Sequence, residues 1–179
     1  EEFIRQIEEL EVMQEDEYIN RKEEEIHDIA HRALALLTPV AKDLRMILAS
    51  IKIASELERI GDHAKNIARQ FIKNEVLFLH ILDDSMQLEQ QILQMLKQSL
   101  EVYEQFDEQS CFDMIEKDES INQFIDACSL KLISDDHISR HDLFMCASIL
   151  RSLERSGDHV KNICEHILYM MKGQHYDFG

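Results

Sequence analysis

The stretch LERIGDHAKNI, residues 57–67, returns 96 residues later as LERSGDHVKNI, residues 153–163. Each copy places a Gly and an Asp inside a run of helix-forming residues, although a Gly costs about 1 kcal/mol relative to Ala within a helix. Helix propensity therefore does not explain why these residues are present. Because the same charged cluster occurs twice, the two copies indicate an internal duplication.

A second pair of matching segments supports this duplication. DEYIN at residues 16–20 corresponds to DESIN at residues 118–122, which lies 102 residues further along the chain. The two offsets differ by six residues, and we expect this difference to fall in a connection between helices, where changes of length are tolerated. The sequence therefore predicts two repeats, residues 1–75 and residues 76–179.

The composition favours an all-α fold. Only four Gly, one Pro and no Trp occur in 179 residues, whereas Leu, Ile, Glu, Lys, Gln and Met are abundant. The hydrophobic fraction of 45% suffices for one good core or two small ones. The four cysteines show no C-x-x-C spacing, so we expect reduced core residues rather than a zinc ribbon or a disulfide framework. These cysteines are Cys111, Cys128, Cys146 and Cys164.

The breaks between helix-forming segments predict five helices. They cover residues 2–37, 39–73 and 76–106, then a segment that ends near residue 134 and a last segment that ends at Gly173. Thr38 is expected to cap the second helix and Pro39 to begin it. The polar segment 107–110 is expected to separate the third helix from the fourth, and Ser139 to help cap the fifth.

The formal net charge of −17 limits the possible partners. It opposes nucleic-acid binding, which needs clusters of Lys and Arg, and it favours cations and basic protein surfaces. A broad acidic surface also simply keeps a protein soluble. No apolar run approaches the roughly 20 residues of a membrane span, and the first residues carry no signal region, so we expect a cytoplasmic protein.

The duplicated cluster places carboxylates on one helix face, because positions four apart lie side by side. Glu58 and Asp62 share such a face. If a second helix brings Asp16 and Asn20 opposite them, the resulting oxygen-rich site suits hard or borderline divalent metals. The second copy would build the same site from Asp118, Asn122, Glu154 and Asp158.

The same spacing is also that of ordinary surface ion pairs. Lys65 follows on the same sector, so the face could simply emerge into solvent, and spacing alone leaves both interpretations open. The neighbouring His63 and His159 are rotated by about 100° around the helix axis, so we do not expect them to be ligands. Gly61 and Gly157 either permit close helix approach or mark a local distortion.

Catalytic motifs are not recognisable in this chain. It has no G-x-S-x-G elbow, no P-loop and no H-E-x-x-H pair, so we expect a protein that is not an enzyme. A carboxylate-bundle metalloenzyme is an alternative, although such proteins usually carry a pair of E-x-x-H motifs on facing helices, which this chain lacks. A purely structural dimerisation module is another alternative, in which neutralising the acidic face would have no consequence.

Taken together, four features resemble the PhoU family of phosphate-uptake regulators. They are the repeated L-E-R-x-G-D-H-x-K-N-I cluster, the preceding D-x-x-I-N, the segment PVAKDLR at residues 39–45 and the ending ICEHILYMMKGQHY at residues 163–176. The resemblance spans nearly the whole chain. It implies an all-α fold of tandem three-helix bundles. Since five helices are predicted where the family pattern has six, the first helix of the first bundle is expected to be absent from this chain.

The resemblance also implies a site for divalent or trivalent metal ions in each bundle, with iron, zinc, magnesium or manganese as candidates. Motif matching assigns the first site to Asp16, Asn20, Glu58 and Asp62, and the second to Asp118, Asn122, Glu154 and Asp158. An Asn at the last position of D-x-x-x-N, in place of Asp, is expected to weaken each site for cations.

The function implied by the resemblance is that of a cytoplasmic negative regulator of phosphate uptake and phosphate-starvation signalling. Such a protein is a non-enzymatic adaptor between a phosphate ABC transporter, through its ATPase subunit, and a sensor histidine kinase. The expected form is a homodimer that reaches the membrane through these partners and binds no nucleic acid. Related domains are also appended to some sodium-phosphate cotransporters, which gives an alternative origin for the chain.

Overall fold

The computed structural model describes residues 2–73 and 77–177, and the regular elements in these ranges are five α-helices. The helices are α1 (Glu2–Leu37), α2 (Ala41–Lys73), α3 (Leu77–Gln105), α4 (Glu108–Ile133) and α5 (Arg140–Lys172). None of the described residues forms a β-strand. The predicted all-α fold with five helices is therefore confirmed. None of the helices in the described ranges is both long and apolar enough to cross a membrane.

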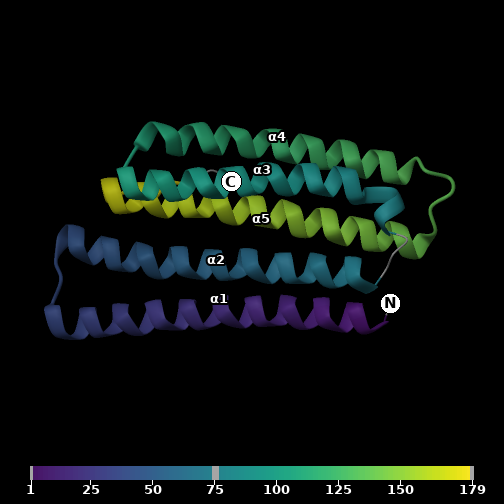
Figure 1. Cartoon of the computed structure of the whole chain (residues 1–179). Coiled ribbons are helices and arrows are strands. Elements are labelled where there is room, and N and C mark those ends of the chain that lie inside the picture. Colours follow the sequence, from purple (N-terminus) through teal and green to yellow (C-terminus); the bar gives the residue numbers. More distant parts are fainter. Residues whose placement is uncertain (1, 74–76, 178–179) are drawn as a thin grey trace.

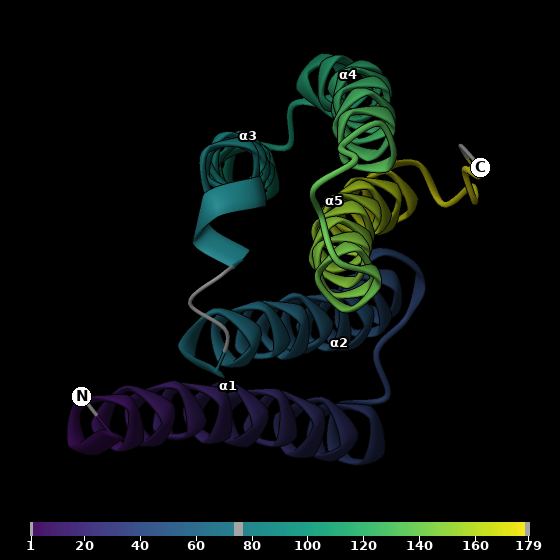
Figure 2. The same ribbon diagram turned by 90° about the vertical axis from the view of Figure 1, so that its right-hand side faces the viewer.

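α3, α4 and α5 run side by side, and α1 and α2 lie side by side at an angle to them (Figure 1 and Figure 2). α5 packs against α2, α3 and α4, while α1 packs against α2. Figure 2, in which α3, α4 and α5 are seen nearly end-on, shows α1 on the far side of α2 from α5. The second repeat is thus a three-helix bundle, and the first contributes a two-helix hairpin. The predicted division at residue 75 lies outside the described residues and stays a prediction.

The core follows α5 along its length, because this helix is covered on several sides. Towards the start of α5, Ile149 and Val160 pack with Leu88 of α3 and Ile121 of α4. Towards its end, a second cluster gathers around Ile167. All four cysteines are free and buried, as expected for reduced core residues. Their burial raises the pKa of each thiol, so the four thiols are neutral and poorly reactive.

The ends of α5 agree with the prediction, whereas the start of α2 does not. Ser139 caps α5 by accepting the backbone N–H of Asp142 at 3.1 Å, and Gly173 ends it in the left-handed conformation at φ 73°. The prediction that Pro39 begins α2 is wrong, because α2 begins at Ala41. Thr38 has a φ of 45°, which is not the extended conformation of an N-cap residue.

Two further expectations about helix boundaries are wrong. The segment 107–110 does not separate α3 from α4, because the Asp107 side chain accepts the backbone N–H of Gln109 and α4 begins at Glu108. The six-residue difference between the repeats does not lie in the connecting loop. α1 extends six residues further past Asp16 than α4 extends past Asp118, and the extra length is helical.

Gly61 and Gly157 lie at close approaches within the two helix pairs. A Cβ atom on Gly61 would lie 3.0 Å from Ile19 Cδ1 of α1. A Cβ atom on Gly157 would lie 3.3 Å from Asp118 Oδ1 and 4.0 Å from Ile121 Cγ2 of α4. Ile19 and Ile121 occupy equivalent positions in the two repeats. Of the two interpretations of these glycines, the structure therefore supports close helix approach.

We expect Gly157→Val to lower the free energy of unfolding by about 1–3 kcal/mol, because the added side chain overpacks the contact between α4 and α5. The control is Ala147→Val, at an exposed position of the same helix, which adds a branched side chain without a neighbouring helix to displace. Urea unfolding followed by circular dichroism measures both variants. Equal losses in the two variants would contradict the close approach at Gly157.

Candidate metal centres

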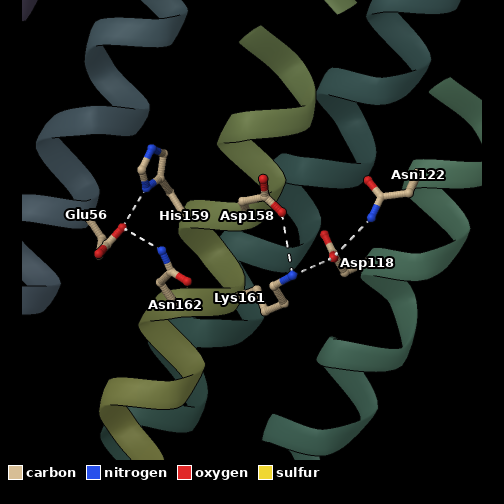
Figure 3. A network of polar contacts seen from close by, with 7 residues as sticks. All are labelled: Glu56, Asp118, Asn122, Asp158, His159, Lys161 and Asn162. Carbon is tan, nitrogen blue, oxygen red and sulfur yellow. Dashed lines mark hydrogen bonds and ion pairs between the residues drawn. The ribbon is translucent and has the colours of Figure 1, made fainter. Parts of the chain in front are cut away.

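The second repeat brings the D-x-x-x-N face of α4 against the E-x-x-x-D face of α5 (Figure 3). Lys161 lies between the two faces: its Nζ is 3.4 Å from Asp118 Oδ2 and 3.5 Å from Asp158 Oδ1. Asn122 donates its Nδ2 to Asp118 Oδ2 at 3.4 Å. Glu154 lies one turn before Asp158 on α5 and is half-buried. Asp118 therefore contacts the duplicated cluster through Lys161, whereas its grouping with Glu154 as a metal ligand stays a prediction.

Burial dominates the electrostatics of this second site. Asp118 is 4% exposed and Lys161 is 8% exposed. Burial raises the pKa of Asp118, although the attraction of Lys161 counteracts this effect. Burial lowers the pKa of Lys161, but the carboxylates of Asp118 and Asp158 outweigh burial and raise it. The pair therefore holds opposite charges in a place where an unpaired charge would be strongly destabilising.

The first repeat contains the same arrangement, but its side chains are more exposed to solvent. Lys65, which is equivalent to Lys161, places its Nζ 2.8 Å from Asp16 Oδ1 of α1 and 2.5 Å from Asp62 Oδ1 of its own helix. Hydrogen bonds to Asp16 and Asp62 raise the pKa of Lys65. The Lys65 and Asp16 side chains are 18% and 14% exposed, compared with 9% and 6% for Lys161 and Asp118, so the first site is more accessible to solvent.

Glu58 lies close to the other acidic groups of the first site. Burial raises its pKa, and nearby carboxylates add to this effect; in decreasing order they are Asp62, Glu23 and Asp16. A carboxylate that is disfavoured as a charged group by burial and by like charges is stabilised when a cation binds beside it. The grouping of Glu58 with Asp16 and Asn20 as metal ligands stays a prediction.

Glu23 is an acidic group of this region that the sequence pattern did not reveal. It accepts a hydrogen bond from the Ser55 hydroxyl at 2.8 Å, which ties α1 to α2. The equivalent position in the second repeat is Ile125, which is buried in the core. Because the two repeats differ here, comparing them could not have identified Glu23. The first site therefore has one nearby carboxylate more than the second.

Several buried oxygens at the two sites have unused hydrogen-bonding capacity. Three predicted ligands have a buried Oδ1 atom without a hydrogen-bond partner, namely Asn20, Asp118 and Asn122. The Oδ1 atom of Asp16, in the first repeat, is held by Lys65 instead. Since buried polar atoms are normally satisfied, this recurrence in both repeats fits an oxygen site for a cation.

The acidic groups of the described residues nevertheless do not form a preformed metal site. Among the described residues, no three His, Cys, Asp or Glu side chains are grouped so that they could hold a metal ion. The ion-pair interpretation is correct in part. Lys65 pairs with Asp62 and Lys161 pairs with Asp158, and in each copy the aspartate lies three residues before the lysine. Each lysine also reaches an Asp of the neighbouring helix, so these are more than surface pairs. Metal binding stays a prediction.

Comparison with known proteins identifies the family of this chain. The PhoU domain matches residues 8–71 and 86–167. The chain belongs to the PhoU family. Among its relatives, a Xylella fastidiosa phosphate-specific transport system accessory protein PhoU homolog is 33% identical, with 91% of this chain and 70% of the relative covered. A Clostridium acetobutylicum protein of the same name is 28% identical, with 94% and 79% covered.

Solved PhoU structures share the fold. The phosphate transport system regulatory protein PhoU from Streptococcus pneumoniae superposes with a TM-score of 0.87 at 29% identity, covering 97% of this chain and 83% of the other. PhoU from Pseudomonas aeruginosa gives a TM-score of 0.84 at 28% identity, with 93% and 82% covered. The predicted PhoU-like helical-bundle fold is therefore confirmed.

A second polar cluster of this PhoU protein joins its two repeats and was not predicted. Glu56 of α2 lies against α5, where His159 Nδ1 is 2.6 Å from Glu56 Oε2 and Asn162 donates to the same oxygen at 3.2 Å (Figure 3). His166 Nε2 lies 3.6 Å from Glu56 Oε1. The three α5 residues are spaced by three and four positions, so they share one helix face. That spacing was the available signal, but it does not identify Glu56 as the partner.

The histidines of the duplicated cluster lie at this same interface between the repeats. The rings of His63 and His159 stack with their centroids 5.5 Å apart. Burial, followed by the charge of His159, lowers the pKa of His63. Burial raises the pKa of Glu56, but hydrogen bonds from His159, His166 and Asn162 outweigh burial and lower that pKa to about 2. Glu56 is therefore a charged acceptor that links α2 to α5.

We expect Glu56→Gln to destabilise the protein by about 2 kcal/mol at neutral pH, since a lowered pKa measures stabilisation of the charged carboxylate in the folded state. This stabilisation is fully present above the ordinary pKa of 4.5 and is lost as the pH falls through about 2. Urea unfolding at several pH values should therefore show the difference from the unsubstituted protein shrinking between these limits. Glu104→Gln, at an exposed position, is the control. A difference that stays constant down to pH 2 would contradict the role of Glu56.

Proposed function

We propose that this chain is a cytoplasmic, non-enzymatic regulator that restrains phosphate uptake and phosphate-starvation signalling. Support comes from its membership of the PhoU family, which the match to both parts of the chain establishes. Its relatives are named as accessory proteins of a phosphate-specific transport system, and one solved relative is titled a regulatory protein of phosphate transport. The proposed action is contact with the transport machinery rather than a chemical reaction.

The proposed partners are the ATPase subunit of a phosphate ABC transporter and a sensor histidine kinase. The net charge of −17 supports contact with basic protein surfaces and opposes contact with nucleic acid. α1 also exposes large apolar side chains, among them Leu10 at 57%, Ile29 at 59% and Leu36 at 77%. Exposed apolar side chains of this kind support protein contacts, including the proposed homodimer.

We also propose that each repeat binds a metal ion at its carboxylate site. The observation that carries this proposal is the recurrence, in both repeats, of a buried asparagine oxygen without a hydrogen-bond partner on the same helix face as a largely buried aspartate. Asp16, Asn20, Glu58 and Asp62 would hold the ion in the first repeat, and Asp118, Asn122, Glu154 and Asp158 in the second. An ion such as iron, zinc, magnesium or manganese would supply positive charge at an acidic face.

The metal part of the proposal is tested by elemental analysis of the natively purified protein and by titration with Mn²⁺. We expect Asp118→Asn to weaken Mn²⁺ binding at the second site at least tenfold, because the substitution removes the buried anionic ligand. Asp126→Asn, at an exposed position of the same helix, is the matched control and should leave binding unchanged. Asp16→Asn and Asp28→Asn form the corresponding pair on α1. Equal affinities within each pair would contradict the site assignment.

The adaptor part is tested by a pull-down from membranes that carry a phosphate ABC transporter, with and without chelator. We expect the protein to retain the transporter ATPase, and chelator or the paired substitution of Asp16 and Asp118 to reduce this retention. If neither chelator nor the substitutions reduce retention of the transporter ATPase, metal is not needed for this contact. Failure to retain any subunit of the transporter or the kinase would contradict the adaptor function itself.

A further inference from the structure

We propose that Lys65 and Lys161 are the resident cations of the two carboxylate sites, and that a metal ion binds by displacing their ammonium groups. This inference rests on the proposed metal binding and adds a role for residues of the chain that are not metal ligands. It also explains how an acidic, partly buried site is held together in the metal-free protein.

The geometry places each ammonium group where an ion would bridge two helices. Lys161 Nζ is within 3.5 Å of carboxylates from α4 and α5, and Lys65 Nζ is within 2.8 Å of carboxylates from α1 and α2. A metal ion binds carboxylate oxygens at about 2.0–2.6 Å. Because an ammonium group and a metal ion cannot share that space, metal binding to the same two aspartates requires the lysine to move.

Burial shows that these lysines are part of the sites rather than of the surface. Lys161 is 8% exposed, whereas lysine is rarely buried unless it is paired. The Lys65 side chain is 18% exposed. By contrast, Lys52 lies on the exposed side of α2. The two site lysines therefore compensate carboxylates that could not otherwise remain charged at these positions.

The lysine satisfies the charge of each site but not all of its oxygens. In the second repeat, Asp118 Oδ1 and Asn122 Oδ1 have no hydrogen-bond partner even though Lys161 lies beside them. An ammonium group is a compact point charge with three N–H donors, so it cannot satisfy a ring of oxygens from two helices. A metal ion, which takes six or more oxygen ligands when water contributes, can use the atoms that the lysine leaves unpaired.

The arrangement occurs in both repeats, which argues against chance. The two lysines occupy equivalent places in LERIGDHAKNI and LERSGDHVKNI, three residues after the aspartate in each copy. Each reaches back to that aspartate and across to the first residue of DEYIN or DESIN. The flexible four-carbon stem of lysine allows the ammonium group to swing away when a more highly charged ion arrives.

Displacement predicts that removing the lysine charge strengthens metal binding. We expect Lys161→Met and Lys65→Met to bind Mn²⁺ at least tenfold more tightly than the unsubstituted protein, measured by calorimetric titration of chelator-treated protein. Lys52→Met changes the net charge equally and should shift the affinity less than twofold. The metal-free Lys161→Met protein should also melt at a lower temperature than the unsubstituted protein. Mn²⁺ should raise the melting temperature of Lys161→Met by more than it raises that of the unsubstituted protein.

The outcomes separate this inference from the proposed function. If the unsubstituted protein binds Mn²⁺ and both lysine variants bind it equally or more weakly, displacement is overturned while metal binding stands. If the variants bind and the unsubstituted protein does not, displacement is supported and native metal binding fails. If neither binds, both fail. Should circular dichroism show that Lys161→Met does not fold, Lys65→Met at the more open site decides the same comparison.

Discussion

Asp118 is a carboxylate inside a helical protein, and its burial requires a positive charge beside it. At 4% exposure it has little access to water, so the second repeat can keep it charged only through a cation. Lys161 meets that requirement and thereby ties α4 to α5. The same constraint applies in the first repeat, where Lys65 ties α1 to α2 through Asp16. The acidic sites are therefore also the polar contacts that join each helix pair.

The glycines make this arrangement sterically possible. Gly157 leaves room for Asp118 Oδ1 against the backbone of α5, and Gly61 leaves room for Ile19 against α2. Beside these contacts, the stacked His63 and His159 and the Glu56 cluster connect the two repeats to each other. Asp158 and His159 are consecutive, so α5 takes part in the site of its own repeat and in the contact with the other repeat. The duplicated sequence thus encodes both the sites and their connection.

The parts of the structure that depend on local pattern could be predicted from the sequence. Helix type, the caps of α5 and the meeting of Asp118 with Asp158 follow from periodicity and from the duplication. The contacts of Glu56 could not be predicted, because its partners lie more than a hundred residues away and its equivalent position holds Ser152. Glu23 was missed because its equivalent position in the second repeat holds Ile125. The start of α2 was wrong because the left-handed turn at Thr38 has no glycine to signal it.

A crystal structure of the protein soaked in Mn²⁺, with the ions located by anomalous scattering, would show directly what occupies the two carboxylate sites. We expect an ion in each repeat, bound by Asp118 and Asp158 in the second and by Asp16 and Asp62 in the first, with the lysine ammonium group turned away. Ions bound elsewhere, such as at Glu56 and His159, or ions at these aspartates with Lys65 and Lys161 unmoved, would overturn the displacement of the lysines by metal.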